Sequence, residues 1–174
     1  MLRVTPAVLS ALMLAAAPVG AQDLETYNAA DAAAYAAWEA LPLTFRTVAF
    51  VTGDAGGYGL YDARDSTVFR QGEPIVLYVE PMGYGWRQEA DGRFSFGFDI
   101  DIVLRNAAGD VVASQESFMR QGLTSRARNR EFYLTLTLNM TGAPAGDYAL
   151  EYIVHDLASD KIGTIARTFS IAAP

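Results

Sequence analysis

The architecture of this chain follows from one run of alternating side chains, Phe94-Ser95-Phe96-Gly97-Phe98-Asp99-Ile100-Asp101-Ile102-Val103-Leu104. Every second position holds a large apolar residue, and a β-strand turns successive side chains to opposite faces of its sheet. The run therefore predicts a half-buried strand whose apolar side is covered by another part of the chain. Ser95, Gly97, Asp99 and Asp101 lie on the other face, which we expect to meet water.

Further alternation on both sides of this run predicts its partners. Residues 132–140 alternate as cleanly and are the best candidate to share the core with the central run. Residues 75–80 carry large side chains on both faces, which is typical of a central strand. Pro81 is expected to end this strand. Gly109 favours a hairpin turn after the central run. Further strand candidates are residues 43–52, 111–118, 148–154 and 162–171. About seven or eight strands are therefore expected, which is the pattern of a sandwich or barrel.

The composition limits the chemistry that this chain can perform. The chain has 174 residues, which is long enough for one domain with a core. Its composition, 51% hydrophobic and 19% charged, is typical of a globular protein. Cysteine is absent and His155 is the single histidine, which excludes a cysteine-ligated or multi-histidine metal site within one chain. We expect no cofactor. The net charge of −7 argues against general binding of nucleic acid, which needs a cationic surface.

Residues 1–21 have the features of a cleaved signal peptide. Arg3 supplies the positive start, residues 7–19 form an apolar region, and Val19-Gly20-Ala21 offers small residues for cleavage. The apolar region is too short to span a bilayer comfortably, so no membrane span is expected after cleavage. No cysteine follows the cleavage position for lipid attachment. These features predict a periplasmic or secreted protein.

The mature chain is expected to begin with a helix. Residues 22–42 are rich in alanine, Asp23 is suited to cap the helix, and Pro42 is suited to end it. Tyr35 and Trp38 are expected to pack this helix onto an end or edge of the β-sandwich, which would occupy residues 43–174.

Two stretches carry a resemblance. Pro144-Ala145-Gly146-Asp147-Tyr148-Ala149-Leu150-Glu151-Tyr152-Ile153-Val154-His155-Asp156 resembles the closing hairpin of bacterial immunoglobulin-like and fibronectin-III-like domains. Phe69-Arg70-Gln71-Gly72-Glu73-Pro74-Ile75-Val76-Leu77-Tyr78-Val79-Glu80 is similar to an early strand in uncharacterised exported bacterial proteins. The resemblance implies an all-β fold, an immunoglobulin-like antiparallel sandwich preceded by the α-helix. It also implies a tyrosine corner at Tyr148, whose hydroxyl would bond to nearby backbone. It names no activity.

The first candidate site is the glycine-rich loop with Tyr84, Trp86 and Arg87, together with Tyr78 and Glu80 on the adjoining strand. Exposed aromatic rings offer large contact area to a sugar or peptide, and the two charged groups can orient a polar ligand. The alternative is that Trp86 caps one end of the core and Arg87 pairs with a nearby acid.

The second candidate site is a group of four arginines in residues 119–131, which are expected to form a long loop: Arg120, Arg126, Arg128 and Arg130. Guanidinium groups bind anions through paired hydrogen bonds, so this group predicts an anionic ligand or partner. The alternative is a solvated loop neutralised by the protein's own carboxylates.

Two further groups are weaker candidates. Asp99 and Asp101 lie next to each other on one strand face, but two carboxylates are too few for a calcium site, and a solvated strand face accounts for them. His155 has Asp156, Ser159 and Asp160 near it in sequence, but no nucleophile motif accompanies it, so catalysis is not expected there.

The sequence therefore favours a periplasmic binding or accessory module without catalysis, whose partner is another periplasmic protein or a small ligand. Two alternatives remain open. One is a small outer-membrane β-barrel, because long strands with one apolar face and a signal peptide fit that class as well. The other is a hydrolase that uses Glu80, Asp99 or Asp101.

Overall fold

The computed structural model describes residues 23–173. They form one helix, α1 (Leu24–Ala40), and nine strands. The strands are β1 (Thr44–Val51), β2 (Val68–Phe69), β3 (Ile75–Met82), β4 (Arg87–Gln88), β5 (Phe94–Asn106), β6 (Val111–Ser125), β7 (Leu134–Leu138), β8 (Gly146–Asp156) and β9 (Ile162–Ile171). The expected signal peptide, residues 1–21, lies outside the described residues. Within residues 23–173, no helix is long and apolar enough to cross a membrane.

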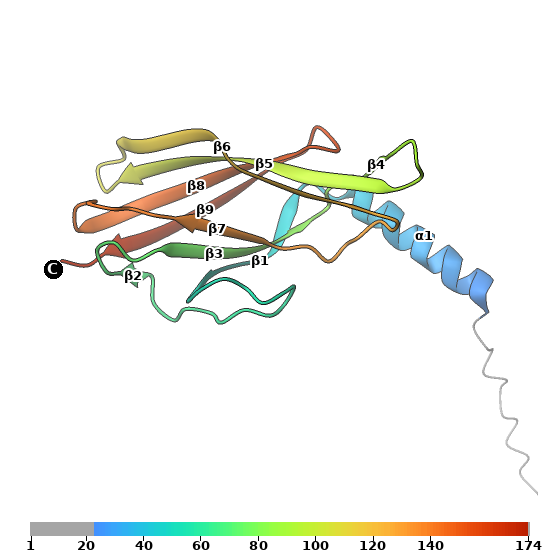
Figure 1. The fold of residues 1–174 in the computed structure, drawn as a ribbon, viewed down its shortest axis with the longest axis horizontal. Helices are drawn as coiled ribbons and strands as arrows, with labels where there is room; N and C mark the ends of the chain where they lie inside the picture. Colours follow the sequence, from blue (N-terminus) through green and yellow to red (C-terminus); the bar gives the residue numbers. More distant parts are fainter. Residues whose placement is uncertain (1–22, 174) are drawn as a thin grey trace, which may run out of the picture.

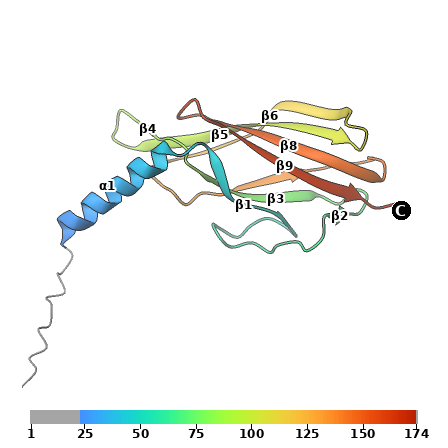
Figure 2. The same cartoon turned by 180° about the vertical axis from the view of Figure 1, so that it is seen from behind.

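The strands form two sheets. The smaller has the order β1-β3-β7, and the larger has the order β2-β9-β8-β5-β4, with β6 paired to the other side of β5. All these pairs are antiparallel except β2 with β9. Figure 1 shows the two sheets lying over each other, with α1 at one end and the C-terminus at the other. Figure 2 shows the same arrangement from behind, with β9 and β1 towards the viewer.

The core lies between the two sheets and confirms the prediction for the central run. Phe96, Phe98, Ile100, Ile102 and Leu104 of β5 are all buried. They share one cluster with buried leucines of β7, which confirms that residues 132–140 cover the central strand from the opposite sheet. β3 is the middle strand of its sheet and is buried along both faces, which confirms the prediction from its large side chains on both faces.

The helix forms as expected. The side chain of Asp23 accepts a hydrogen bond from Thr26 N at 2.8 Å and so satisfies one of the free amides of the first turn. The least exposed residues of α1 follow a helical period along one stripe: Asp31, Ala34, Tyr35 and Trp38. The turns before this stripe are exposed and extend beyond the sandwich (Figure 1).

Two expectations about strand limits are wrong. Residues 119–125 are not a loop, because β6 continues to Ser125 and pairs with β5 along that length. Pro81 does not end β3, which reaches Met82. β7 pairs with β3 only as far as Val79, so Pro81 stands where β3 has lost its second neighbour and a missing amide is tolerated.

The predicted tyrosine contact is present. Tyr148 is buried, and its hydroxyl donates to Pro144 O at 2.8 Å. This bond ties the start of β8 to the turn before it. The chain is thus an all-β domain with one N-terminal helix, and its two sheets pack around a common core.

Candidate functional site

The helix end of the sandwich joins the two candidate sites that the sequence kept apart. Trp38 of α1 donates from Nε1 to Tyr84 O at 2.9 Å. Tyr84 Oη and Trp86 Nε1 both donate to Asn129 O, at 2.8 and 3.1 Å. Tyr84 is 0% exposed, contrary to the exposed position expected for it, and burial raises the pKa of its hydroxyl. This aromatic cluster therefore attaches α1 to the sandwich.

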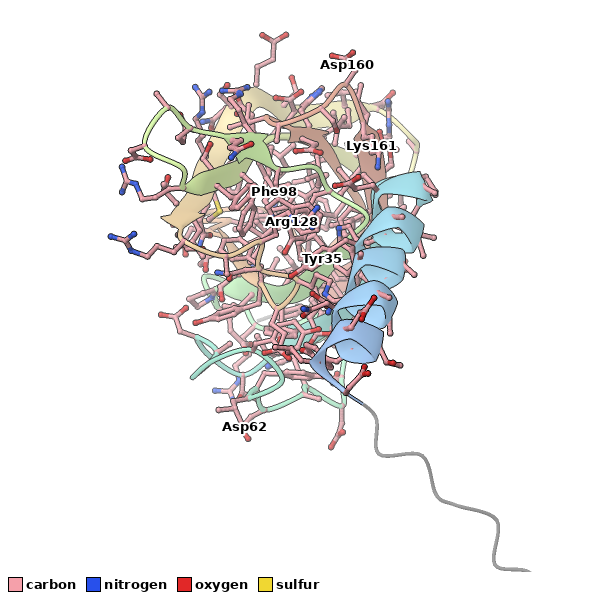
Figure 3. All side chains as sticks on the ribbon, turned by 90° about the vertical axis from the view of Figure 1, so that its right-hand side faces the viewer. Tyr35, Asp62, Phe98, Arg128, Asp160 and Lys161 are labelled. Carbon is pink, nitrogen blue, oxygen red and sulfur yellow. The ribbon has the colours of Figure 1, made fainter. Side chains whose placement is uncertain are left out.

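Two of the four arginines belong to the same end. Arg128 lies 3.8 Å from the centre of the Tyr35 ring and pairs with Glu39 at 3.2 Å, and Arg130 pairs with Asp31 at 3.3 Å. Figure 3, which looks onto this end, shows Tyr35 and Arg128 side by side next to the helix. These two arginines already have partners on α1. Arg126 is exposed beyond the end of β6.

A lysine that the sequence did not single out fixes the end of the helix. Lys161 Nζ donates to three carbonyl oxygens, Glu39 O at 2.7 Å, Leu41 O at 2.8 Å and Gly83 O at 2.7 Å. A cation at a helix C-terminus is favoured by the free carbonyls there. At Gly83 the chain has φ of 76°, and a Cβ would lie 2.3 Å from Pro42 O, so only glycine fits this close approach.

Tyr78 and Glu80 lie on the outer face of the smaller sheet and not in an open site. Glu80 is 5% exposed and accepts hydrogen bonds from Tyr78 Oη at 2.7 Å and Thr47 Oγ1 at 3.0 Å. The ring of Tyr61 stacks on that of Tyr78 with centroids 4.2 Å apart, so the loop between β1 and β2 covers this face. Burial and the neighbouring Glu80 raise the pKa of Tyr78. The carboxylate is thereby satisfied inside the fold.

The lone histidine lies in a polar row on the outer face of the larger sheet. His155 Nε2 is 2.8 Å from Asp101 Oδ2, while Ser117 Oγ donates to Asp99 Oδ2 at 3.1 Å. Within the described residues no hydrogen bond joins Ser117 to His155, so the row is not a nucleophile relay. Nor do residues 23–173 contain a group of three or more histidine and carboxylate side chains that would hold a metal ion. Asp156 is buried and accepts a hydrogen bond from Gly85 N at 2.7 Å.

One hollow on this face, of ≈ 550 Å³, lies beside the polar row. It brings together one residue from each predicted group, Arg87 and Arg120. Ser95 pairs with Arg87 of β4, and Asp99 pairs with Arg120 of β6, on the opposite side of β5. Directly paired residues point to the same face, so both arginines lie on the outer face of the sheet. We refer to this feature as the outer-face hollow.

Two facing glycines lie between the arginines of the outer-face hollow. Ser95 and Asp99 are separated along β5 by roughly 13 Å, and Gly97 lies midway between them on the same face. Gly97 is opposite Gly122 of β6, and a Cβ on Gly122 would lie 2.6 Å from Phe96 O. Gly122 is exposed and leaves bare backbone between the two arginines, whereas Gly97 is buried, with Leu157 Cδ1 3.3 Å from the place where its Cβ would lie.

The charges of the outer-face hollow are not neutralised by ion pairs. Among the ion pairs of residues 23–173, none includes Arg87 or Arg120. Arg87 donates to Leu157 O at 2.7 Å, which holds it at the rim. Two carboxylates lie near the hollow: Asp99, which is paired with Arg120 and accepts from Ser117 at Oδ2, and Glu89, which accepts from Ser95. The hollow is therefore suited to an oxyanion, which guanidinium groups bind through charge-assisted hydrogen bonds.

In comparisons with known proteins, no protein-family model matches this chain, and no curated protein matches it.

Proposed function

We propose that this protein is an exported, non-catalytic binding module of the bacterial periplasm, built on an immunoglobulin-like sandwich. It holds an oxyanion-bearing ligand or partner, with a carboxylate, phosphate or sulfate group, in the outer-face hollow. The observation that carries this proposal is the pair of arginines on opposite sides of β5, without ion-pair partners in the described part of the chain, with the exposed Gly122 between them.

The strand order supports the immunoglobulin-like part of the proposal. A β1-β3-β7 sheet faces a sheet with the order β9-β8-β5-β6, and the short β2 runs parallel to β9. Fibronectin-III-like and immunoglobulin-like sandwiches share this kind of Greek-key arrangement with a tyrosine corner at the penultimate strand. The bond from Tyr148 to Pro144 O fits that corner. The features of residues 1–21 support export.

The buried carboxylates and the exposed arginines support a binding role over a catalytic one. Glu80 and Asp156 are the buried carboxylates, and both are saturated by hydrogen bonds that hold the fold together. The charged side chains that line the outer-face hollow are those of Arg87 and Arg120, whose guanidinium groups are permanently charged and poor at proton transfer. They recognise anions instead.

The proposal is tested by capture from a periplasmic extract on the immobilised mature chain, residues 22–174. The comparison is with the Arg87→Ala/Arg120→Ala variant and with Arg70→Ala/Arg105→Ala, which removes the same charge from exposed positions outside the hollow. Capture that is lost only in the first variant supports the proposal. Equal capture by all three proteins, or capture by none, counts against it.

A further inference from the structure

β6 leaves one long edge of the larger sheet unpaired. It has 15 residues, is exposed along most of its length, and lies at the margin of the molecule in Figure 1. Within residues 23–173 it pairs with β5 and with no other strand. Such an edge presents free amides and carbonyls, and natural proteins usually blunt it with proline, lysine or a short strand. β6 contains neither proline nor lysine.

A bulge divides this edge into two halves. Ser117 has φ of 48°, and its amide donates to Asp101 Oδ1 at 2.8 Å, so the chain folds over the outer face there. The ladder is irregular between Ile100 and Ile102 and again beyond Leu104. Residues 119–125, in contrast, pair with β5 without interruption. Only this second half offers a straight edge to another strand.

The end of β6 and the residues that follow it are basic in an acidic protein. Residues 117–130 contain four arginines and no carboxylate, while the whole chain has a net charge of −7. Arg128 and Arg130 pair with α1, but Arg120 and Arg126 take part in no ion pair among the described residues. The outer side of the edge therefore carries Arg120, beside Asp99 of β5, and Arg126 lies just beyond the end of the strand.

The inner side of the same edge carries two apolar residues, which alternate with Gln121 and Ser125. Met119 pairs with Ile100 and Leu123 with Phe96, and both partners are buried in the core, so these two side chains turn inward. Leu123 is 37% exposed because no strand lies beyond it. An added strand would thus meet apolar side chains on one face and arginine on the other.

We propose that residues 119–125 accept an extended segment of a partner protein in which acidic and apolar residues alternate. The segment adds to the sheet as a new edge strand: its main chain bonds to β6, its apolar side chains cover Leu123, and its carboxylates meet Arg120 and Arg126. This inference rests on the proposed function, because a carboxylate beside Arg120 reaches the outer-face hollow.

Charge complementarity selects an acidic partner over a second copy of this chain. A second copy paired through the same edge would bring its own Arg120 and Arg126 to a surface that is already cationic, and like charges at an interface are unfavourable. An acidic strand gains from both arginines, and the attraction also speeds its encounter with the edge.

The test uses two synthetic peptides with the mature chain. The probe is Thr-Leu-Asp-Val-Glu-Val-Asp-Leu-Thr, and its control is Thr-Leu-Asp-Pro-Glu-Pro-Asp-Leu-Thr, which keeps the charge but cannot form a ladder. Binding is followed by nuclear magnetic resonance, and amide hydrogen exchange reports which strand is covered. We expect the probe to slow exchange in residues 119–125 and the proline control to leave it unchanged.

Variants locate the interaction. Arg120→Glu/Arg126→Glu is expected to weaken binding of the probe by about tenfold or more, and Arg70→Glu, an exposed arginine elsewhere, to leave it unchanged. Equal binding of both peptides overturns strand addition but leaves the oxyanion hollow in place, because the carboxylates are common to both. Protection outside residues 119–125, no binding of the probe, or a dimer that occupies this edge also overturns the inference.

Discussion

Arg87 and Arg120 lie on strands that flank β5 on opposite sides, yet both line one hollow on the outer face of the larger sheet. Nothing in their sequence positions connects them. The link is the register of β5, which places Gly97 between their paired neighbours and the exposed Gly122 of β6 opposite it.

Tyr148 and Tyr152 of β8 form a matched pair for testing the tyrosine corner. Both are buried, but Tyr148 Oη donates to Pro144 O, whereas Tyr152 Oη has no hydrogen-bond partner within the described residues. Tyr148→Phe is expected to lower the free energy of unfolding by about 0.5–1.5 kcal/mol, and Tyr152→Phe to leave it unchanged or raise it. Urea unfolding measures both, and an equal loss in the two variants would contradict the assignment of the corner.

Trp38 is predicted to be the main attachment of α1. It is 6% exposed, contacts the rings of Tyr84 and Trp86, and donates to a backbone carbonyl. Trp38→Ala is expected to release the helix, since truncating a buried tryptophan typically costs about 3–5 kcal/mol. Limited proteolysis should then cut within residues 23–42 much faster than in the parent. Tyr27→Ala, in an exposed turn of the same helix, should behave like the parent; equal sensitivity would show that Trp38 does not hold the helix.

Lys161 is predicted to stabilise the helix end through its three carbonyl contacts. Lys161→Met keeps most of the side-chain volume but removes the donors, and a charged hydrogen bond contributes about 1.5–3 kcal/mol. We expect a lower urea midpoint for this variant. The neighbouring exposed residue supplies the control, Asp160→Asn, which should unfold like the parent. An unchanged midpoint for Lys161→Met would mean that water replaces the ammonium group without cost.

Asp101 is predicted to make stability depend on pH. The Ser117 amide and then His155 lower the pKa of its carboxyl below the ordinary value. A lowered pKa in the folded state means that this carboxylate stabilises the fold above its unfolded pKa of about 4 and that the gain is lost as pH falls through the folded pKa. Asp101→Asn should therefore reduce stability at pH 7 and flatten the loss of stability on acidification. Urea midpoints between pH 7 and pH 3 measure this, and parallel curves for both proteins would contradict it.

The sequence predicted the parts of the fold that depend on one-sided burial. The alternation in β5 and residues 132–140 identified two strands of the core, and the alanine-rich stretch with Asp23 identified the helix. The first half of β6 was predicted as residues 111–118, but its second half escaped prediction because an edge strand is exposed on most of its surface, so burial imposes no clean alternation on it. The bulge at Ser117 interrupts the pattern further.

The candidate sites were predicted less well, because side chains from distant segments decide their surroundings. Tyr84 is in a glycine-rich stretch that suggests exposure, but Trp38 and Asn129 cover it. Lys161 binds carbonyls from two remote segments, which no local pattern reports. Arg87 and Arg120 were both selected from the sequence for their charge, but their common hollow depends on strand register, which sequence alone leaves open.

The most direct test of the oxyanion hollow is a nuclear magnetic resonance titration of the mature chain with sodium sulfate at low ionic strength, where charge interactions are least screened. We predict saturable shifts of the Gly97 and Gly122 amides that disappear in Arg87→Ala/Arg120→Ala and persist in Arg70→Ala/Arg105→Ala. Shifts that remain in the first variant, or that cluster away from these two glycines, would contradict the assignment of the hollow as the binding site.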